Sequence, residues 1–322
     1  MIPEDDLEPD KYDHYAELFE ARRTDRKAAR KRKQPYNHDI TELAEPSGLE
    51  GGFNTTYQPA RYESEWLLAS LRPFYDEHLI SDVLAQVKGG KEASVYRCTA
   101  HPGIGAELLA AKVYRPRMFR NLRNDKLYRE GRVVLTAEGR AVKRTDHRIM
   151  RALGKKTAFG AQVQHTSWLM YEYTTMERLY QAGGAVPRPV AVGENAILMS
   201  YYGDDRRAAP TLNEITLARK EAERLFQAVL GNIELLLQHG LIHGDLSAYN
   251  LLYWQGQVTL IDFPQVTAVR TNANAAFILQ RDITRVCEYF ARQGVACDPI
   301  AIMNDLWGRY APATLDAQAA FE

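Results

Sequence analysis

The stretch His243–Phe263, "HGDLSAYNLLYWQGQVTLIDF", places three oxygen-bearing side chains beside apolar, strand-like runs. Asp245 precedes the first run, Asn250 follows five residues later, and Asp262 ends the second run. The glycine in "WQGQ" predicts a turn, so the two runs should pair as a hairpin that returns Asp262 to the neighbourhood of Asp245 and Asn250. Each polar residue alone is typical of an N-cap or Asx-turn. Together, Asn250 and Asp262 suit a hard cation and Asp245 suits a proton acceptor.

Length and composition favour an ordinary globular protein. The 322 residues are 45% hydrophobic and 25% charged, which suits one large domain, or two lobes with a tail. The net charge of zero gives no global argument for nucleic acid, and three cysteines without a CxxC pair argue against disulfides or zinc. The sequence has neither a membrane-length apolar run nor a signal-peptide core at its acidic N-terminus, so we expect a cytoplasmic protein without membrane contact.

The first part of the chain is polar and then becomes strand-rich. Residues 1–60 form a polar extension with a basic run, Arg22–Lys33, which is either a solvated segment or an arm for RNA. A helix is expected over Glu63–Phe74. Three strand-like runs follow, "SDVLAQV", "ASVYRC" and "ELLAAKVY", and the glycine-containing link "KGGKE" between the first two indicates an antiparallel meander.

A basic insertion interrupts this pattern at about residues 115–160. Between Arg115 and Lys156 the chain has 14 arginine and lysine residues against four acidic ones, with few regularly spaced aliphatic residues. Long segments of this kind are usually functional or disordered. A helix is expected next, with Thr166 or Ser167 as its N-cap and Gly183-Gly184 as its end.

The second half of the chain is rich in helices. Two short strands, "RPVAVG" and "AILMSYYG", precede helices expected at about 216–238, 273–292 and 299–310. This order predicts an α+β fold with two lobes. The expected divisions are an extension over residues 1–60, a β-rich N-lobe over 61–200 and a helical C-lobe over 201–322.

Two upstream features add to the first stretch. Lys112 lies inside the apolar strand "LLAAKVY", where a lysine is costly to bury without a partner, and Glu172 on the following helix could supply one. The alternative is that Lys112 points outward from the strand. Glycines in "KGGKEASVY" would let backbone N–H groups approach a phosphate, although the same sequence also suits a plain hairpin.

These parts, in this order, are those of a protein-kinase-like fold, and the sequence resembles the RIO family of atypical serine protein kinases. "GKEASVY" at 90–96 is similar to the family's nucleotide loop. "HGDLSAYN" at 243–250 and "IDFPQ" at 261–265 are similar to its catalytic and metal loops, and "RDITRVCEYF" at 281–290 resembles its C-terminal helix. A member close to the first RIO branch, or a prokaryotic one, fits these motifs.

The resemblance implies a role for each matching residue. Asp245 would be the catalytic aspartate, and Asn250 and Asp262 would bind Mg²⁺, with Mn²⁺ as an alternative. Lys112 would bind ATP phosphates and pair with Glu172. The remaining ATP-binding positions would be the glycine-rich turn with the strand after it, and a hinge that begins at the gatekeeper: Gly89, Gly90, Lys91, Ser94 and Val95, and Met199, Tyr201 and Tyr202.

The sequence also departs from ordinary protein kinases. Pro264 stands where the DFG motif has its glycine, and Ser247 stands where many protein kinases carry a lysine two residues after the catalytic aspartate. These two departures argue against efficient phosphorylation of a peptide in trans. The resemblance implies a serine/threonine protein kinase or ATPase that acts on protein serine, on itself or on water, with a link to maturation of the small ribosomal subunit.

Two other functions remain open at this point. Aminoglycoside and choline kinases resemble the segment through "HGD", the asparagine and "IDF", but "GKEASVY", Ser247 and the "PQ" after Phe263 argue against them. An RNA- or ribosome-binding protein that uses ATP as a switch is favoured by the basic segments, which would contact ribosomal RNA or a small-subunit precursor.

Overall fold

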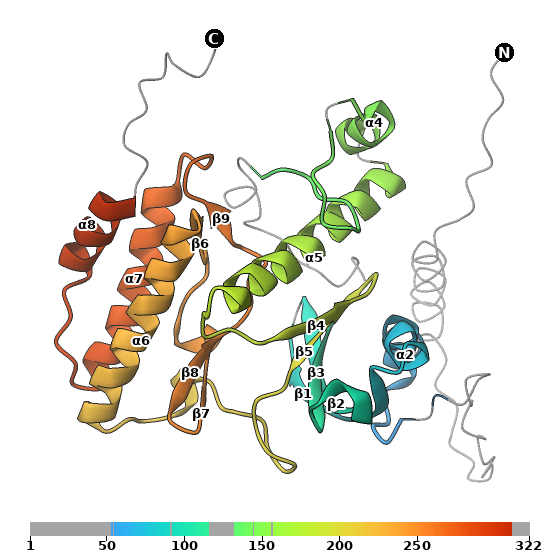
Figure 1. Cartoon of the computed structure of the whole chain (residues 1–322), viewed down its shortest axis with the longest axis horizontal. Helices are drawn as coiled ribbons and strands as arrows, with labels where there is room; N and C mark the ends of the chain where they lie inside the picture. Colours follow the sequence, from blue (N-terminus) through green and yellow to red (C-terminus); the bar gives the residue numbers. More distant parts are fainter. Residues whose placement is uncertain are drawn as a thin grey trace, which may run out of the picture.

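The computed structural model describes residues 53, 55–90, 92–115, 132–143, 145–155 and 157–310. Lys91 and the basic run Arg22–Lys33 lie outside these residues. Within them, a strand-rich part and a helix-rich part lie side by side (Figure 1). The α+β, bilobal, kinase-like architecture expected from the sequence is confirmed.

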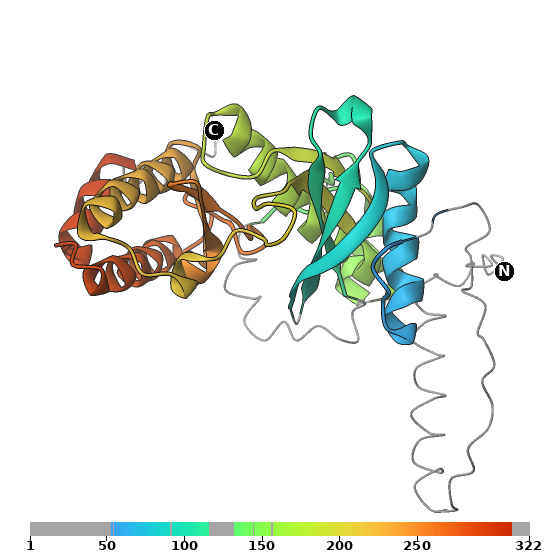
Figure 2. The ribbon, with the colours of Figure 1, turned by 90° about the horizontal axis from the view of Figure 1, so that it is seen from below.

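The strand-rich part is a five-stranded antiparallel sheet in the order β1-β2-β3-β5-β4. Its strands are β1 (Ile80–Gly89), β2 (Ala93–Ala100), β3 (Leu108–Tyr114), β4 (Pro189–Val192) and β5 (Ala196–Ser200), with a short 3-10 turn, η1 (Pro102–Ile104), before β3. Inward-facing residues alternate along β2, as a strand with one buried face requires. Helix α2 (Arg61–Asp76) runs beside the sheet (Figure 2) and buries Leu67 and Leu71 in the sheet's core.

Helix α5 (Ala158–Gln181) begins earlier than the sequence suggested. Its N-cap is Thr157, whose side-chain oxygen accepts a hydrogen bond from the Gly160 N–H at 3.1 Å, so the predicted caps Thr166 and Ser167 are wrong. The first helical turns, over residues 158–167, were not predicted because their small, apolar and polar side chains do not form a strong apolar period. A further helix, α4 (His147–Lys155), lies inside the expected insertion, of which residues 116–131, 144 and 156 lie outside the described residues.

The helix-rich part consists of α6 (Arg219–Gln238), α7 (Ala275–Arg292) and α8 (Pro299–Tyr310), which lie side by side in Figure 1 and agree with the predicted helices to within a few residues. The predicted hairpin is present as β7 (Leu251–Trp254) and β8 (Gln257–Leu260), with its turn at Gln255-Gly256. A second small sheet pairs β6 (Leu241–Ile242) with β9 (Thr267–Ala268), and two 3-10 turns, η3 (Leu212–Glu214) and η4 (Ala248–Asn250), complete the described elements.

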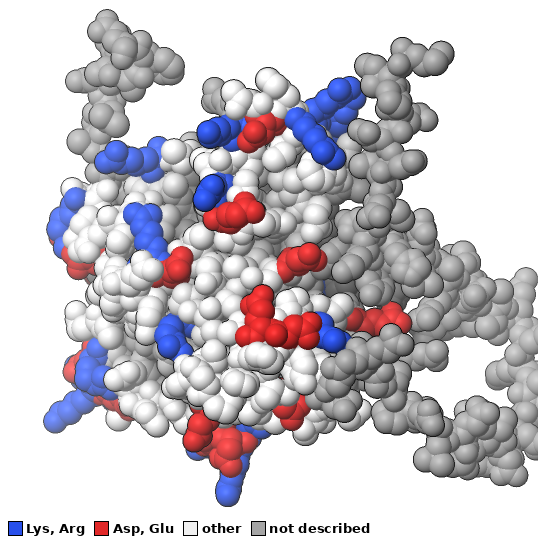
Figure 3. Space-filling model, turned by 45° about the vertical axis from the view of Figure 1, so that its right-hand side comes forward, with Lys and Arg blue, Asp and Glu red and all other residues white. Residues whose placement is uncertain are grey.

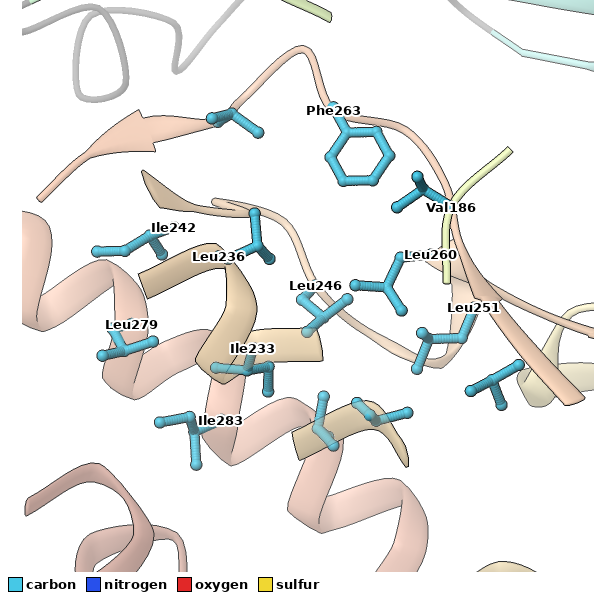
Figure 4. Close-up of a cluster of buried hydrophobic side chains, with 14 of the residues drawn as sticks. Val186, Ile233, Leu236, Ile242, Leu246, Leu251, Leu260, Phe263, Leu279 and Ile283 are labelled. Atoms are coloured by element: carbon cyan, nitrogen blue, oxygen red, sulfur yellow. The ribbon is translucent and has the colours of Figure 1, made fainter. Parts of the chain in front are cut away.

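An apolar core between α6, α7 and the β7–β8 hairpin anchors the loops that carry the polar residues. Leu246, which follows Asp245, and Phe263, which follows Asp262, are buried and point into this core (Figure 4). They belong to the same buried cluster as Ile233 and Leu236 of α6 and Ile283 of α7. Each loop is thus held by an apolar side chain immediately next to its aspartate, which restricts where that aspartate can lie.

The described surface agrees with the overall neutrality of the chain. Basic and acidic side chains are intermingled on the face drawn in Figure 3. Among the described residues, none of the helices combines the length and the apolar character that crossing a bilayer requires.

Candidate active site

Lys112 lies at the centre of the site, on the middle strand β3, and is buried. Its ammonium group contacts Glu172 Oε1 at 2.5 Å and Asp262 Oδ1 at 2.6 Å. Burial by itself would lower the pKa of Lys112, but the two carboxylates outweigh it and hold this pKa well above its ordinary value. The predicted pairing with Glu172 is confirmed, and the outward-facing alternative for Lys112 is wrong. Lys112 is therefore a fixed positive charge of the kind that holds phosphate oxygens.

Glu172 is the buried partner that orients this lysine from helix α5. Its second carboxylate oxygen accepts a hydrogen bond from the Tyr114 hydroxyl, which lies on the same strand as Lys112. Burial, followed by the charge of Glu172, raises the pKa of Tyr114 well above its usual value, so the phenol remains a donor. Tyr114 was not predicted from the sequence, because its position in "KVY" is typical of an ordinary core aromatic residue.

Asp262 directly follows Ile261 at the end of the hairpin and has a left-handed backbone conformation, with φ of 72°. This conformation costs a residue other than glycine about 1 kcal/mol and is found at functional sites more than elsewhere. Burial raises the pKa of Asp262, but the adjacent Lys112 ammonium outweighs it, so the net shift is downward and the carboxylate is ionised. Its Oδ1 contacts Lys112, while Oδ2 has no hydrogen-bond partner among the described residues.

Asp245 and Asn250 share one loop that is closed by internal hydrogen bonds. The Asn250 Nδ2 donates to the Asp245 backbone carbonyl at 2.8 Å and lies 3.4 Å from the Asp245 carboxylate. The Ile261 N–H donates to the Asn250 carbonyl at 3.0 Å, just beyond the hairpin pair Leu251–Leu260. The hairpin therefore returns Asp262 to the neighbourhood of Asn250, as the sequence predicted.

His243 contacts the backbone of the same loop as a neutral imidazole. Its Nε2 lies 3.1 Å from the Ile261 carbonyl and its Nδ1 lies 3.3 Å from the Asp245 N–H, so the proton is assigned to Nε2. Burial lowers the pKa of His243 below its ordinary value, which favours this uncharged form. The histidine thus links the strand end before Asp262 to the backbone of Asp245.

Gly244 joins the loop to the segment after Asp262 and to helix α7. Its φ is 87°, and a Cβ at this position would lie 2.2 Å from the Gln265 carbonyl oxygen, so only glycine fits. The Gly244 N–H donates to Asp282 Oδ2 at 2.7 Å, and its carbonyl accepts from the Arg281 guanidinium. Burial raises the pKa of Asp282 to about 7 despite the neighbouring Arg281.

Helix α7 also reaches the side chain of Asp245. Arg285 Nη1 lies 2.8 Å from Asp245 Oδ1, one helical turn beyond Arg281. The sequence reading gave Arg281, Asp282 and Arg285 no role. One signal was present, since Asp282 is a charged residue at a buried position of an otherwise apolar helical stripe.

Arg132, within the basic insertion, holds the segment after Asp262. Its guanidinium donates to the carbonyls of Pro264 at 2.8 Å and Val266 at 3.0 Å, and lies over the Tyr171 ring at 5.3 Å. The Tyr171 hydroxyl in turn accepts from the Val133 N–H at 2.9 Å. The insertion therefore contributes to the site rather than merely extending from it, which its composition did not reveal.

The glycine-rich turn joins β1 to β2, the strand that pairs with the Lys112 strand. Val95 on β2 is the register partner of Lys112, and Gly90 closes the turn with an N–H donated to the Ala93 carbonyl at 2.9 Å. A Cβ on Gly90 would lie 2.7 Å from that carbonyl oxygen. Gly89 ends β1, and Ser94 is fully buried, with its hydroxyl 3.4 Å from Arg115 Nη2. The binding roles of these residues remain predictions, as does that of Lys91, which lies outside the described residues.

The three expected hinge residues lie at the end of β5. Met199 pairs with Ala110 of β3 and is partly buried against the core. Tyr201 and Tyr202 follow the strand, and the Tyr202 carbonyl accepts a hydrogen bond from the Ala209 N–H at 2.9 Å. The hinge role of this segment in holding adenine remains a prediction.

The donors around Asp262 fit a metal that takes part of its coordination from phosphate. Among the described residues there is no group of three or more His, Cys, Asp or Glu side chains that could hold an ion alone. The Asn250 side chain donates its Nδ2 hydrogen bond within the loop, so its side-chain oxygen Oδ1 is available to a metal. Asp262 binds Lys112 through Oδ1, so its Oδ2 is available as well. Two oxygen donors of this kind, completed by water and phosphate, are typical of Mg²⁺ sites.

Comparison with known proteins gives the same grouping. The family model described as the RIO domain matches residues 112–302. The serine/threonine-protein kinase RIO1 of Chaetomium thermophilum is 29% identical over 231 residues, which cover 68% of this chain and 41% of that relative. The RIO-type kinases Rio1 of Haloferax volcanii and Thermoplasma acidophilum are 36% and 30% identical, over 41% of this chain and 44% and 68% of their own lengths. The chain thus spans less than half of the first two relatives.

Proposed function

The chain belongs to the RIO domain family, and from this premise we propose that it is a serine/threonine protein kinase or ATPase that uses ATP and Mg²⁺. One observation carries the proposal, namely that Lys112 is held between Glu172 and Asp262 at 2.5 and 2.6 Å. The three residues come from β3, α5 and the end of the hairpin. A buried lysine that is paired with one buried carboxylate, here Glu172, and one half-exposed carboxylate, here Asp262, is the arrangement that binds a triphosphate and its metal.

Each residue then has a part in the transfer of the γ-phosphoryl group. Lys112 binds phosphate oxygens, with Glu172 orienting it. Asn250 and Asp262 would hold Mg²⁺, which would neutralise charge on the phosphates. Asp245 accepts the proton of the attacking hydroxyl as its oxygen bonds to the γ-phosphorus and the bond to ADP breaks. The hydroxyl belongs to a protein serine, to the chain itself or to water.

Incubation with γ-labelled ATP tests this proposal, with the label followed on the chain, on added protein and as free phosphate. Asp245→Ala should retain ATP binding and lose turnover by about 10²- to 10⁴-fold. Asp262→Ala should instead lose the Mg²⁺-dependent part of nucleotide binding in calorimetry. Turnover that is absent in the unaltered chain, or unchanged in Asp245→Ala, would refute the assignment.

We also propose that the basic segments contact ribosomal RNA or a small-subunit precursor in the cytoplasm. The described part of the insertion exposes Arg148, Arg151 and Lys155 on α4, which supports this proposal. Affinity for RNA that rests on phosphate contacts should fall steeply with salt. A titration between low and moderate salt checks this, and replacing the three residues together by glutamine should flatten the salt dependence. Flat or absent binding in the unaltered chain would contradict the proposal.

A further inference from the structure

The loop that carries Asp245 lacks the cation that many protein kinases place beside the catalytic aspartate. That cation is a lysine two residues after the aspartate, where this chain has Ser247. Transfer of a phosphoryl group develops negative charge on the three equatorial oxygens, so a nearby positive charge is a large part of catalysis. A positive charge near the phosphoryl group therefore has to come from another residue of this chain.

Helix α7 brings three charged side chains, Arg281, Asp282 and Arg285, to the loop from little more than one helical turn. Arg281 and Asp282 bind the carbonyl and the N–H of Gly244, so they hold the backbone. Arg285, one turn later, instead binds the Asp245 carboxylate, with Nη1 at 2.8 Å from Oδ1. Arg281 and Asp282 therefore stabilise the loop backbone, whereas Arg285, among the described residues, contacts only the Asp245 carboxylate.

Arg285 is also placed where a bound molecule can reach it. Its side chain is 39% exposed and that of Asp245 is 40% exposed, whereas the side chain of Asp282 is only 2% exposed. Exposed ion pairs add little to folding stability, so the Arg285–Asp245 pair is not needed to hold the loop. A guanidinium has five N–H donors in a flat fork, and only Nη1 has a hydrogen-bond partner among the described residues.

The position of the attacking oxygen follows from the Asp245 carboxylate. Because Oδ1 is bound to Arg285, Oδ2 is the oxygen that remains to accept a proton, and its closest described partner is Asn250 Nδ2 at 3.4 Å. An attacking oxygen bound to Oδ2 has to lie about 3 Å from the γ-phosphorus before transfer. The Arg285 guanidinium contacts Oδ1 of the same carboxylate, so it lies one carboxylate group away from the attacking oxygen.

We propose that Arg285 binds the phosphoryl group during its transfer and so takes the part of the missing lysine at position 247. The inference rests on the proposed function, since it assigns a further residue to the same reaction. Arginine suits the role because its fork binds phosphate in a bidentate manner and remains charged. The cation reaches the site from a helix about 40 residues downstream instead of from the loop itself.

The first test compares Arg285→Met with Arg285→Lys and with Arg292→Met, an exposed arginine on the same helix that serves as the control. Thermal unfolding should be similar for all three. Arg285→Met should lower kcat for ATP turnover by about 10³-fold or more, in the range seen for arginines that stabilise phosphoryl transfer, while KM for ATP changes by less than about threefold. Arg285→Lys should keep part of the rate, and Arg292→Met all of it.

A binding measurement gives a readout that is independent of turnover. Aluminium fluoride with ADP and Mg²⁺ mimics the transferring phosphoryl group, and such mimics bind far more tightly than ground-state ligands when the site complements the transition state. The unaltered chain and Arg292→Met should bind ADP more tightly when aluminium fluoride is added. Arg285→Met should bind ADP normally and lose most of this gain.

A rescue experiment completes the test. Ser247→Lys introduced together with Arg285→Met should restore turnover by about tenfold or more, since a lysine there supplies the same charge. A double variant no faster than Arg285→Met would count against the inference. Unchanged or increased kcat in Arg285→Met would overturn it, and an increase would identify Arg285 as a lock on Asp245. If the unaltered chain turns over no ATP, the proposed function fails first, whereas normal turnover in every Arg285 variant defeats only this inference.

Discussion

Lys112 Nζ lies 2.6 Å from Asp262 Oδ1, although 150 residues separate them in the chain. The lysine comes from the middle strand of the five-stranded sheet and the aspartate from the end of the β7–β8 hairpin. Because Glu172 contacts the same ammonium group from helix α5, this one charge joins three elements. The site therefore depends on how the two parts of the molecule meet as much as on the residues themselves.

Removing Lys112 should destabilise the fold because Glu172 would keep a buried charge. Lys112→Met leaves that carboxylate with Tyr114 as its side-chain donor, and breaking a buried ion pair costs about 3 kcal/mol or more. Adding Glu172→Gln to Lys112→Met should recover most of this loss. Urea unfolding of both single variants and the double variant measures the coupling. Additive losses would show that the pair contributes no shared stability.

Gly244→Ala should impair folding and turnover together. The new Cβ would meet the Gln265 carbonyl at 2.2 Å in addition to a φ of 87°, so the loop or the segment after Asp262 has to move. We expect a loss of about 2 kcal/mol or more in the free energy of unfolding, and loss of ATP turnover.

Gly240→Ala is the matched control for this change. Gly240 has a similar φ of 70°, but a Cβ there would meet nothing within 4 Å. It should cost about 1 kcal/mol from backbone strain alone and leave turnover near normal. Equal effects of the two substitutions would mean that the contact with Gln265 is unimportant.

Asp282 should give the stability of the chain a measurable pH dependence. Burial raises its pKa from 3.8 to about 7 in the folded state, so its stabilising contribution is complete below about pH 4 and is lost as the pH rises to 7. Relative to Asp282→Asn, the unaltered chain should therefore lose stability between pH 4.5 and 7.5, by an amount on the order of a few kcal/mol. Urea unfolding of both chains at several pH values measures this difference. A constant difference, or one of opposite sign, would contradict the assignment.

Arg132→Ala should weaken binding of Mg²⁺ with ATP without unfolding the chain. Its hydrogen bonds to the Pro264 and Val266 carbonyls restrain the segment after Asp262, and losing them should cost about 1 to 2 kcal/mol in binding, roughly tenfold in Kd. Arg140→Ala, an exposed arginine in the same region, should have no effect. Calorimetry with and without Mg²⁺ distinguishes the two. Normal affinity in Arg132→Ala would show that the segment is held by Phe263 and the core alone.

Much of the fold was predictable because its signals are local. The runs around Lys112 alternate as strands do, and the helices near 219–238, 275–292 and 299–310 have clear apolar periods and ends. The start of α5 was not predictable in this way. Its first two turns lack a regular apolar stripe, and its real cap at Thr157 is set by the close approach of Gly160 to the end of α4.

The order of Lys112, Glu172, Asp245, Asn250 and Asp262 along the chain predicted the fold class, and it predicted that these residues come together, whereas their roles in binding and catalysis stay predictions. The sequence could do this because the spacing between Asp245, Asn250 and Asp262 is set by one loop and one hairpin. The contacts of Arg132, Asp282 and Arg285 were decided only by tertiary structure. Each of these residues reaches the site from a distant segment, and a charge on a helix or insertion looks like ordinary solvated surface until packing shows which carbonyl or carboxylate it meets.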